Sequence, residues 1–193
     1  MNIYYIIAYI SIFIWLFPPI RQYKTEYFYF FLILALTDVV VFLLIKLIKL
    51  FPTNPQTIYL FSAVLLILSL VKLDKIKAAF LFCLVGIIIF ICNKYDAKLM
   101  LVLYALINFA ILLIILYKFI QYLMNNNSIS IFFVFLISYE LSLVLKNIVA
   151  FTDLLQGVTL FSITTLFEIA FGIIFTFVNV NTKVYKLPVK DIE

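Results

Sequence analysis

Long apolar runs separated by short polar stretches make up most of the chain. Seven runs can be drawn, covering residues 3–20, 28–50, 56–71, 77–94, 99–122, 130–150 and 156–180. A helix rises about 1.5 Å per residue and the hydrocarbon layer is about 30 Å thick, so runs of this length are typical of membrane-spanning helices. The third run is short, and it is the one that would be re-entrant if any were. The pattern predicts an all-α, polytopic membrane protein with seven transmembrane helices.

The composition agrees with this pattern. Of the 193 residues, 67% are hydrophobic and 12% are charged, whereas soluble domains contain roughly 45 to 50% apolar and about 25% charged residues. Frequent Ile, Lys and Asn are typical of an AT-rich bacterial genome, so we expect an inner-membrane protein. Residues 1–180 are interpreted as a single seven-helix membrane domain and residues 181–193 as a short cytoplasmic tail. The short connections exclude a soluble catalytic or effector domain.

Basic residues predict the orientation, because lysine and arginine collect in cytoplasmic loops. Nine of the 14 basic residues follow the first, third, fifth and seventh runs, and five lie at the other face. The amino terminus is therefore expected outside and the carboxy terminus in the cytoplasm. The sequon Asn126-Asn127-Ser128 then lies in a cytoplasmic loop, and we interpret it as a turn in which Ser128 or Ser130 caps the next helix.

Three acidic residues lie near the centres of predicted helices. They are Asp38, Glu140 and Glu168. An acid at a helix centre costs roughly 2.5 to 3.5 kcal/mol on insertion scales. Each acid is therefore expected to face other helices or a wet cavity rather than lipid.

Polar residues accompany these acids at helical spacing. In the last run Thr164, Glu168, Gly172 and Thr176 recur every four residues and form one stripe, with a small residue that allows close approach. In the sixth run Glu140 and Asn147 share a face next to Lys146, and the fifth run contributes Asn108, one turn after Tyr104. The predicted intramembrane polar site comprises Asp38, Glu140, Glu168, Thr164, Asn108, Asn147 and Lys146.

This site has two interpretations, and the sequence leaves both open. In the functional interpretation the groups converge at the midplane and bind a small polar ligand, relay protons or accept a charge from a partner helix. In the structural interpretation they only bond across helices, at roughly 0.6 kcal/mol per bond and about 1.7 at most. Bonds of that size do not offset the insertion cost, which favours a function for at least one acid. Lys46 and Lys146 are expected to extend toward the outer headgroups rather than to pair with Asp38 or Glu140.

Sites typical of enzymes are missing from the sequence. The chain has no histidine, and Cys83 and Cys92 lie in one predicted helix. Nine residues correspond to about 13 Å of helix, which is too far for a disulfide, and two cysteines in one helix do not make a zinc site. Gly86, Gly157 and Gly172 are isolated and form no phosphate-binding loop. We expect no enzyme activity, no cofactor, no metal and no nucleic-acid partner.

A faint internal repeat relates the second and third runs to the sixth and seventh. The matched blocks are Phe30-Phe31 and Asp38 with Phe132-Phe133 and Glu140, and Leu60-Phe61-Ser62 with Leu160-Phe161-Ser162. A repeat of this kind would make the first three and last three helices parallel triplets with the fourth as an inverting link.

This 3+1+3 layout, with an outside amino terminus and Trp15-Leu16-Phe17-Pro18-Pro19 at the inner end of the first helix, resembles the PQ-loop and SWEET transporter group. Members of that group carry a proline there, often Pro-Gln. Here Pro19 is followed by Ile20, and the fifth helix has no proline, so the resemblance does not imply substrate transport. The layout is also similar to the heptahelical membrane regions of some bacterial sensor kinases.

Small size and short loops favour a non-catalytic integral membrane protein. We expect either an accessory subunit of an inner-membrane complex or a sensor-like module that acts through a protein partner in the bilayer. The alternative is a small-solute or proton-coupled carrier of PQ-loop-like shape. Against the carrier stand the lack of a mid-membrane proline and the scarcity of glycine, since transporters commonly break helices at the binding site.

Overall fold

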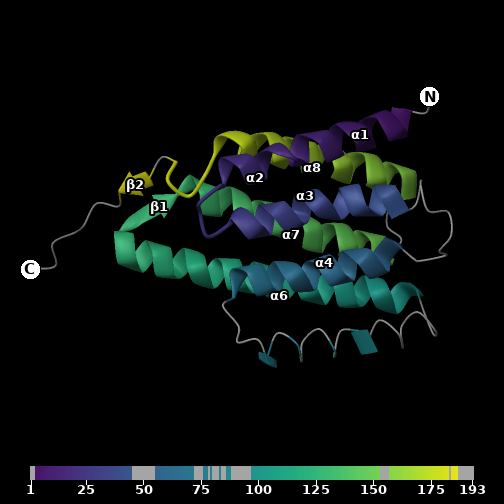
Figure 1. Ribbon diagram of the computed structural model, residues 1–193, viewed down its shortest axis with the longest axis horizontal. Coiled ribbons are helices and arrows are strands. Elements are labelled where there is room, and N and C mark those ends of the chain that lie inside the picture. The colour runs from purple at the N-terminus through teal and green to yellow at the C-terminus, as the bar shows by residue number, and fades with distance from the viewer. Residues whose placement is uncertain are drawn as a thin grey trace, which may run out of the picture.

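A computed structural model of the chain shows a bundle of helices (Figure 1). It describes residues 3–44, 55–71, 97–152, 157–182 and 184–186, together with residues 76, 77, 79, 83, 86 and 87. The helices are α1 (Ile3–Trp15), α2 (Phe17–Arg21), α3 (Phe28–Leu43), α4 (Pro55–Leu70), α6 (Ala97–Asn126), α7 (Ile131–Thr152) and α8 (Gly157–Phe177). The helical class is thus confirmed, and six predicted runs contain helices. The fourth run, residues 77–94, lies mostly outside the described residues, as do Lys46 and Cys92.

Six of these helices form a closed ring. Each packs against the next in the order α1, α3, α4, α6, α7 and α8, and α8 returns to α1 (Figure 1). Short connections make α3 antiparallel to α1, and α7 antiparallel to both α6 and α8. The interior of the ring is therefore lined by side chains from all six helices.

The first predicted helix differs from expectation, because it breaks at Leu16 into α1 and α2. Helix α2 begins at Phe17, and Pro18 and Pro19 follow in its first turn, where proline has no backbone N–H to donate to the preceding turn. Gln22, which follows α2, is fully buried. Its side-chain Nε2 donates to the backbone carbonyl of Val178, just beyond the end of α8, at 2.8 Å. The break thus ties α2 to the end of α8.

A short β-ribbon at the same end of the bundle was not predicted. Strand β1 (Ser128–Ser130) pairs antiparallel with β2 (Val184–Lys186). The expected cap of α7 is wrong for Ser128, whose buried Oγ has no hydrogen-bond partner among the described residues, and Ser130 Oγ donates to the carbonyl of Val180 at 3.5 Å. Part of the expected tail, residues 181–193, is therefore paired with the loop that precedes α7.

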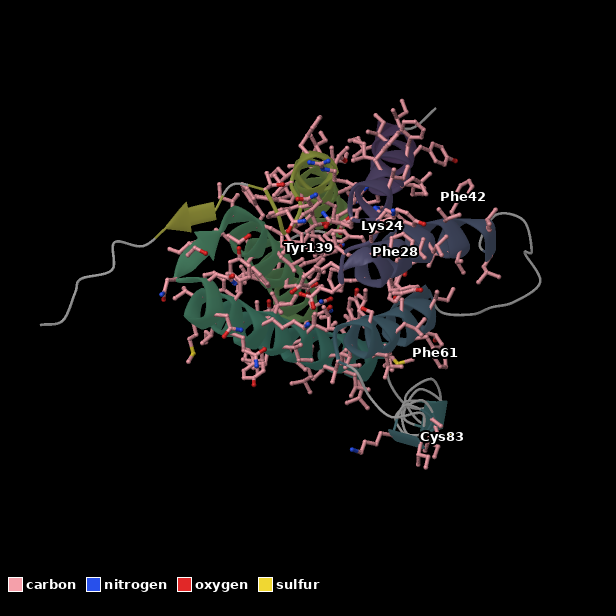
Figure 2. The ribbon with its side chains drawn as sticks, turned by 60° about the vertical axis from the view of Figure 1, so that its left-hand side comes forward. Lys24, Phe28, Phe42, Phe61, Cys83 and Tyr139 are labelled. Carbon is pink, nitrogen blue, oxygen red and sulfur yellow. The ribbon has the colours of Figure 1, made fainter. Side chains whose placement is uncertain are left out.

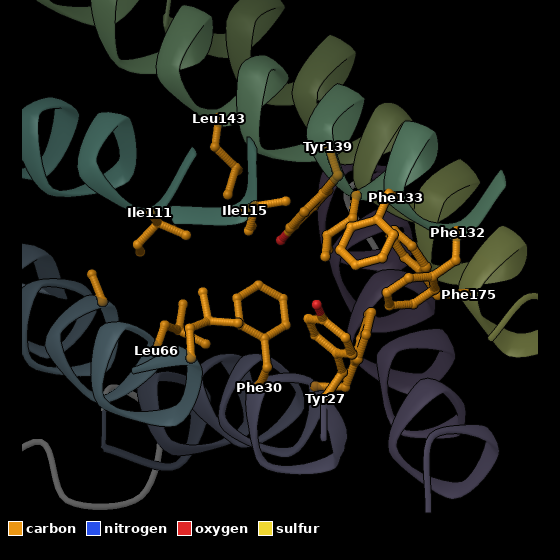
Figure 3. Close-up of a cluster of buried hydrophobic side chains, with 14 of the residues drawn as sticks. Tyr27, Phe30, Leu66, Ile111, Ile115, Phe132, Phe133, Tyr139, Leu143 and Phe175 are labelled. Atoms are coloured by element: carbon orange, nitrogen blue, oxygen red, sulfur yellow. The ribbon is translucent and has the colours of Figure 1, made fainter. Parts of the chain in front are cut away.

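Aromatic side chains fill the half of the ring where α3 and α7 begin and α8 ends. Phe31 lies 4.9 Å from Phe175 between ring centroids, and Phe132 lies 6.0 Å from Phe175. All three are fully buried, with Tyr27 and Phe133 beside them (Figure 3). The Phe pairs that suggested an internal repeat therefore meet in one cluster.

Close approach of α1 and α8 extends this cluster. A Cβ atom on Gly172 would lie 2.8 Å from Ile14 Cγ2 and 3.4 Å from Trp15 Nε1, so the glycine allows the contact. The close approach expected at the small residue of this stripe is thus confirmed at Gly172. Trp15, the sole tryptophan of the sequence, is buried against Tyr139 and Phe175.

The outer surface of the helices is apolar. Two helical stretches, Leu99–Asn126 and Ile131–Thr152, are long and apolar enough to cross a membrane, with mean hydropathies of 2.9 and 1.8. Shorter apolar stretches of 10–17 residues occur in α1–α2, α3, α4 and α8. Large apolar side chains such as Leu106, Leu113 and Phe167 are more than half exposed. The described cysteine, Cys83, is also exposed and free rather than packed in a core (Figure 2).

Replacement of Phe132 by alanine is expected to lower the free energy of unfolding by about 3 to 5 kcal/mol, because it opens a cavity in the aromatic cluster. Val134→Ala, at an exposed position two residues along α7, serves as the control and should cost much less. Trp15 fluorescence during unfolding in mild detergent reports both. Equal losses for the two variants would contradict the central role of the cluster.

Candidate functional site

A cavity of about 400 Å³ occupies the other half of the ring, where α1, α4, α6 and α8 begin. All six helices contribute to its wall. Its polar and charged lining residues are Ser11, Thr37, Asp38, Tyr59, Ser62, Tyr104, Asn108, Tyr139, Lys146, Asn147, Thr165 and Glu168. Trp15 and Tyr139 belong both to the cavity wall and to the aromatic cluster, which therefore forms the floor of the cavity. Figures 2 and 3 show Tyr139 in the interior of the bundle.

Lys146 and Glu168 form an ion pair across α7 and α8. Lys146 Nζ donates to Glu168 Oε1 at 2.7 Å, and the two side chains are 33% and 20% exposed. The expectation that Lys146 extends toward the headgroups is therefore wrong. Glu168 on the neighbouring helix is within reach, whereas Glu140 of the same helix lies about 9 Å away along the axis. Partly desolvated ions also gain more from pairing than exposed ones.

Asp38 also lines the cavity, and it is half-buried in α3. Tyr59 of α4 donates a long hydrogen bond from its hydroxyl to Asp38 Oδ1 at 3.3 Å. The Tyr59 ring lies 6.2 Å from that of Tyr104 in α6. Unlike Glu168, Asp38 thus has a neutral partner and keeps its charge uncompensated at that contact.

Several polar side chains of the cavity wall donate hydrogen bonds to backbone carbonyls of their own helices. Thr37 Oγ1 and Ser62 Oγ donate to backbone carbonyls at 2.7 and 2.8 Å. Asn108 Nδ2 and Asn147 Nδ2 do the same at 2.9 and 2.8 Å. Each of these contacts uses one donor, so the two hydroxyl groups keep their lone pairs, and each asparagine keeps Oδ1 as an acceptor and one N–H as a donor. The four side chains therefore still offer acceptors to the cavity.

Two members of the predicted site lie outside the cavity wall. Glu140 is fully buried one turn beyond Leu143, toward the aromatic cluster, and neither of its carboxyl oxygens has a hydrogen-bond partner among the described residues. Thr164 donates to the carbonyl of Leu160 at 2.8 Å, within its own helix. The structure therefore brings together five predicted residues, namely Asp38, Asn108, Lys146, Asn147 and Glu168, and leaves these two apart.

The sequence analysis missed part of the wall. Thr165, which is buried, lines the cavity in place of its neighbour Thr164. Its three-residue spacing from Glu168 could have identified it, because positions three apart share a helix face as much as positions four apart do. Ser11 and Tyr59 carried no signal, since neither lies near a charged residue in sequence. Ser11 Oγ is buried without a partner among the described residues.

The arrangement can hold a small solute, since ligand sites are typically cavities of about 300 to 1,000 Å³ with a few placed polar groups. Within the described ranges no three His, Cys, Asp or Glu side chains are grouped closely enough to hold a metal ion. The cavity instead combines an internal ion pair, a further carboxyl group and aromatic rings. Such a wall can bind by hydrogen bonds, charge and aromatic contact.

A double-mutant cycle measures the ion pair. Lys146→Met and Glu168→Gln are each expected to destabilise the protein, because each leaves an unpaired group in the wall. The coupling energy should be about 1 to 3 kcal/mol. The exposed pair Lys118–Glu26, at 3.2 Å, is the matched control, and Lys118→Met with Glu26→Gln should couple by less than about 1 kcal/mol. Thermal and denaturant unfolding supply the values, and equal coupling in the two pairs would rule out a special role for the first.

Comparisons with protein-family models, with curated proteins and with solved structures found no match for this chain. The resemblance of its layout to the PQ-loop and SWEET group, or to the membrane regions of sensor kinases, therefore stays a prediction. The argument for a function has to come from the cavity and the residues that line it.

Proposed function

We propose that the chain is a seven-helix integral membrane protein that binds a small polar solute in the cavity of its helix ring and acts as a sensor-like module through a membrane partner. The cavity carries the proposal. A space of about 400 Å³ that holds Asp38 and the Lys146–Glu168 pair is not a packing requirement of the bundle. Polar groups in such a place are costly unless paired or wet, so a ligand is the natural partner of those that remain.

Membrane insertion is supported by the apolar exterior. Large hydrophobic side chains are exposed on every helix of the ring, as Ile10, Leu36, Leu65, Leu113, Leu145 and Phe167 illustrate. A monomeric soluble protein rarely exposes apolar surface on this scale, whereas lipid covers it at no cost. With the predicted orientation, the cavity lies in the outer half of the bilayer and the aromatic cluster in the inner half.

Reporter fusions test the crossings. Green fluorescent protein fused after Glu193, or inserted after Asn126, should fluoresce, and alkaline phosphatase at these positions should be inactive, because both positions are expected in the cytoplasm. The same reporters inserted after Thr152 should give the opposite result. Active phosphatase at the carboxy terminus would contradict the seven-span orientation.

Solute binding is tested by filling the cavity. A panel of amines, amino acids, polyols and dicarboxylates is screened for solutes that raise the unfolding temperature of the detergent-purified protein, and a solute at 100 times its Kd should add about 2.7 kcal/mol. Ser62→Leu places a larger side chain in the wall and should abolish the effect. Ser138→Leu makes the same change on the exposed face of α7 and should not.

Two results would count against the proposal. A panel in which no solute stabilises the wild-type protein would leave the cavity without a ligand. Equal stabilisation of Ser62→Leu and Ser138→Leu would place the binding elsewhere.

A small-solute carrier is the second candidate, and the ring arrangement favours it. The consecutive helices α1, α3 and α4 neighbour one another as α6, α7 and α8 do, and the two sets meet at α4–α6 and at α8–α1. Such pairs of triplets suit rocking of one half against the other around a central site. Uptake of the stabilising solute into reconstituted vesicles would indicate the carrier, whereas binding without uptake would indicate the sensor-like module. The accessory-subunit hypothesis stays a prediction that copurification of a stoichiometric partner would test.

A further inference from the structure

The charges of the cavity wall do not cancel. Lys146 forms an ion pair with Glu168 through the 2.7 Å contact, whereas the hydrogen bond that Asp38 accepts comes from the neutral hydroxyl of Tyr59, at 3.3 Å. Among the described wall residues the sum is one negative charge. A bound solute of opposite charge would neutralise the wall, whereas an anion would add a second unpaired charge to it.

The hydrogen-bonding groups of the cavity wall are compatible with the same kind of solute. Thr37 and Ser62 donate their hydroxyl protons to backbone carbonyls and keep their lone pairs, and Asn108 and Asn147 keep Oδ1 as an acceptor beside one N–H. The buried hydroxyl of Ser11 has no partner among the described residues and can accept as well as donate. A solute with N–H donors at one end therefore finds acceptors in this wall.

Aromatic rings supply the remaining surface. Tyr59 and Tyr104 lie 6.2 Å apart between centroids on one side of the cavity, and Trp15 and Tyr139 lie 5.1 Å apart on another. The faces of tyrosine and tryptophan rings attract cations, most strongly where water is excluded. They also bury the apolar body of a solute.

We propose that the solute is a small organic ammonium ion, a protonated primary amine on an apolar body, whose charge is held by Asp38 and whose body lies between the two aromatic pairs. The inference rests on the proposed function and narrows it to one ligand class. Lys146 serves as the residue that cancels Glu168 and so keeps the cavity at one net negative charge.

Four probes of nearly equal shape and different charge test the class. They are 2-phenylethylamine, 2-phenylethanol, 3-phenylpropionate and phenylalanine, which are a cation, a neutral molecule, an anion and a zwitterion. Isothermal calorimetry on the detergent-purified protein should show the amine binding about 30-fold tighter than the alcohol, a factor within the range that a hydrogen bond to a charged carboxylate, here that of Asp38, supplies. The anion and the zwitterion should bind more weakly than the amine.

Asp38→Asn should reduce the preference for the amine over the alcohol to about threefold or less, because the neutral amide no longer pairs with the ammonium charge. Glu26→Gln makes the same acid-to-amide change far from the cavity and should retain the full preference. Unfolding temperatures without probe establish that each variant is folded.

The outcomes separate the inference from the function it rests on. Equal binding of amine and alcohol, or tighter binding of the anion or the zwitterion, overturns the ammonium class and leaves solute binding intact. The ammonium class is also overturned if none of the four probes binds, while another solute of the broader panel stabilises the wild-type protein but not Ser62→Leu. Failure of every solute in that panel overturns the proposed function itself.

Discussion

An ionisable side chain inside an apolar bundle requires a partner or water, and this constraint organises the interior of the molecule. The three acids meet it in different ways. Glu168 takes a cation from the neighbouring helix through Lys146. Asp38 takes a tyrosine hydroxyl and faces the cavity. Glu140 has neither among the described residues and lies fully buried, a place where a carboxyl group costs least as the neutral acid.

The division of the ring into a filled half and a hollow half follows from side-chain size. At one end the inward positions are aromatic, and Phe31, Phe132 and Phe175 meet at the axis. At the other end many inward positions are short, as Ala8, Ser11, Thr37, Ser62 and Thr165 show. Large side chains are needed to fill the axis of a ring of six helices at the density of a protein interior. The same helix spacing therefore leaves no space at the first end and a cavity at the second.

Apolar periodicity was sufficient to predict the helices but not their mutual rotations. Six runs appear as helices with ends shifted by a few residues, since a long apolar run can hardly form anything else. The break at Leu16 was not predicted, although Pro18 and Pro19 carry a signal for it. The β-ribbon has no such signal, because pairing of Ser128–Ser130 with Val184–Lys186 joins segments far apart in the chain. For the site, the costly acids indicated the right helix faces, but Tyr59 and Ser11 have no such signature.

The partner of Lys146 shows that the packing of helices, rather than distance along the sequence, decides which ionisable side chains pair. Along the sequence its nearest acid is Glu140, six residues away and about 9 Å along the helix axis; the structure pairs it with Glu168, 22 residues away, because α7 and α8 place those two side chains at one level. That choice sets the charge of the cavity. If Lys146 pointed outward, Asp38 and Glu168 would face one space as two uncompensated acids, and their repulsion would favour binding of two charges or a divalent ion. With the pair formed, Asp38 is the charge among the described wall residues that no ion pair compensates.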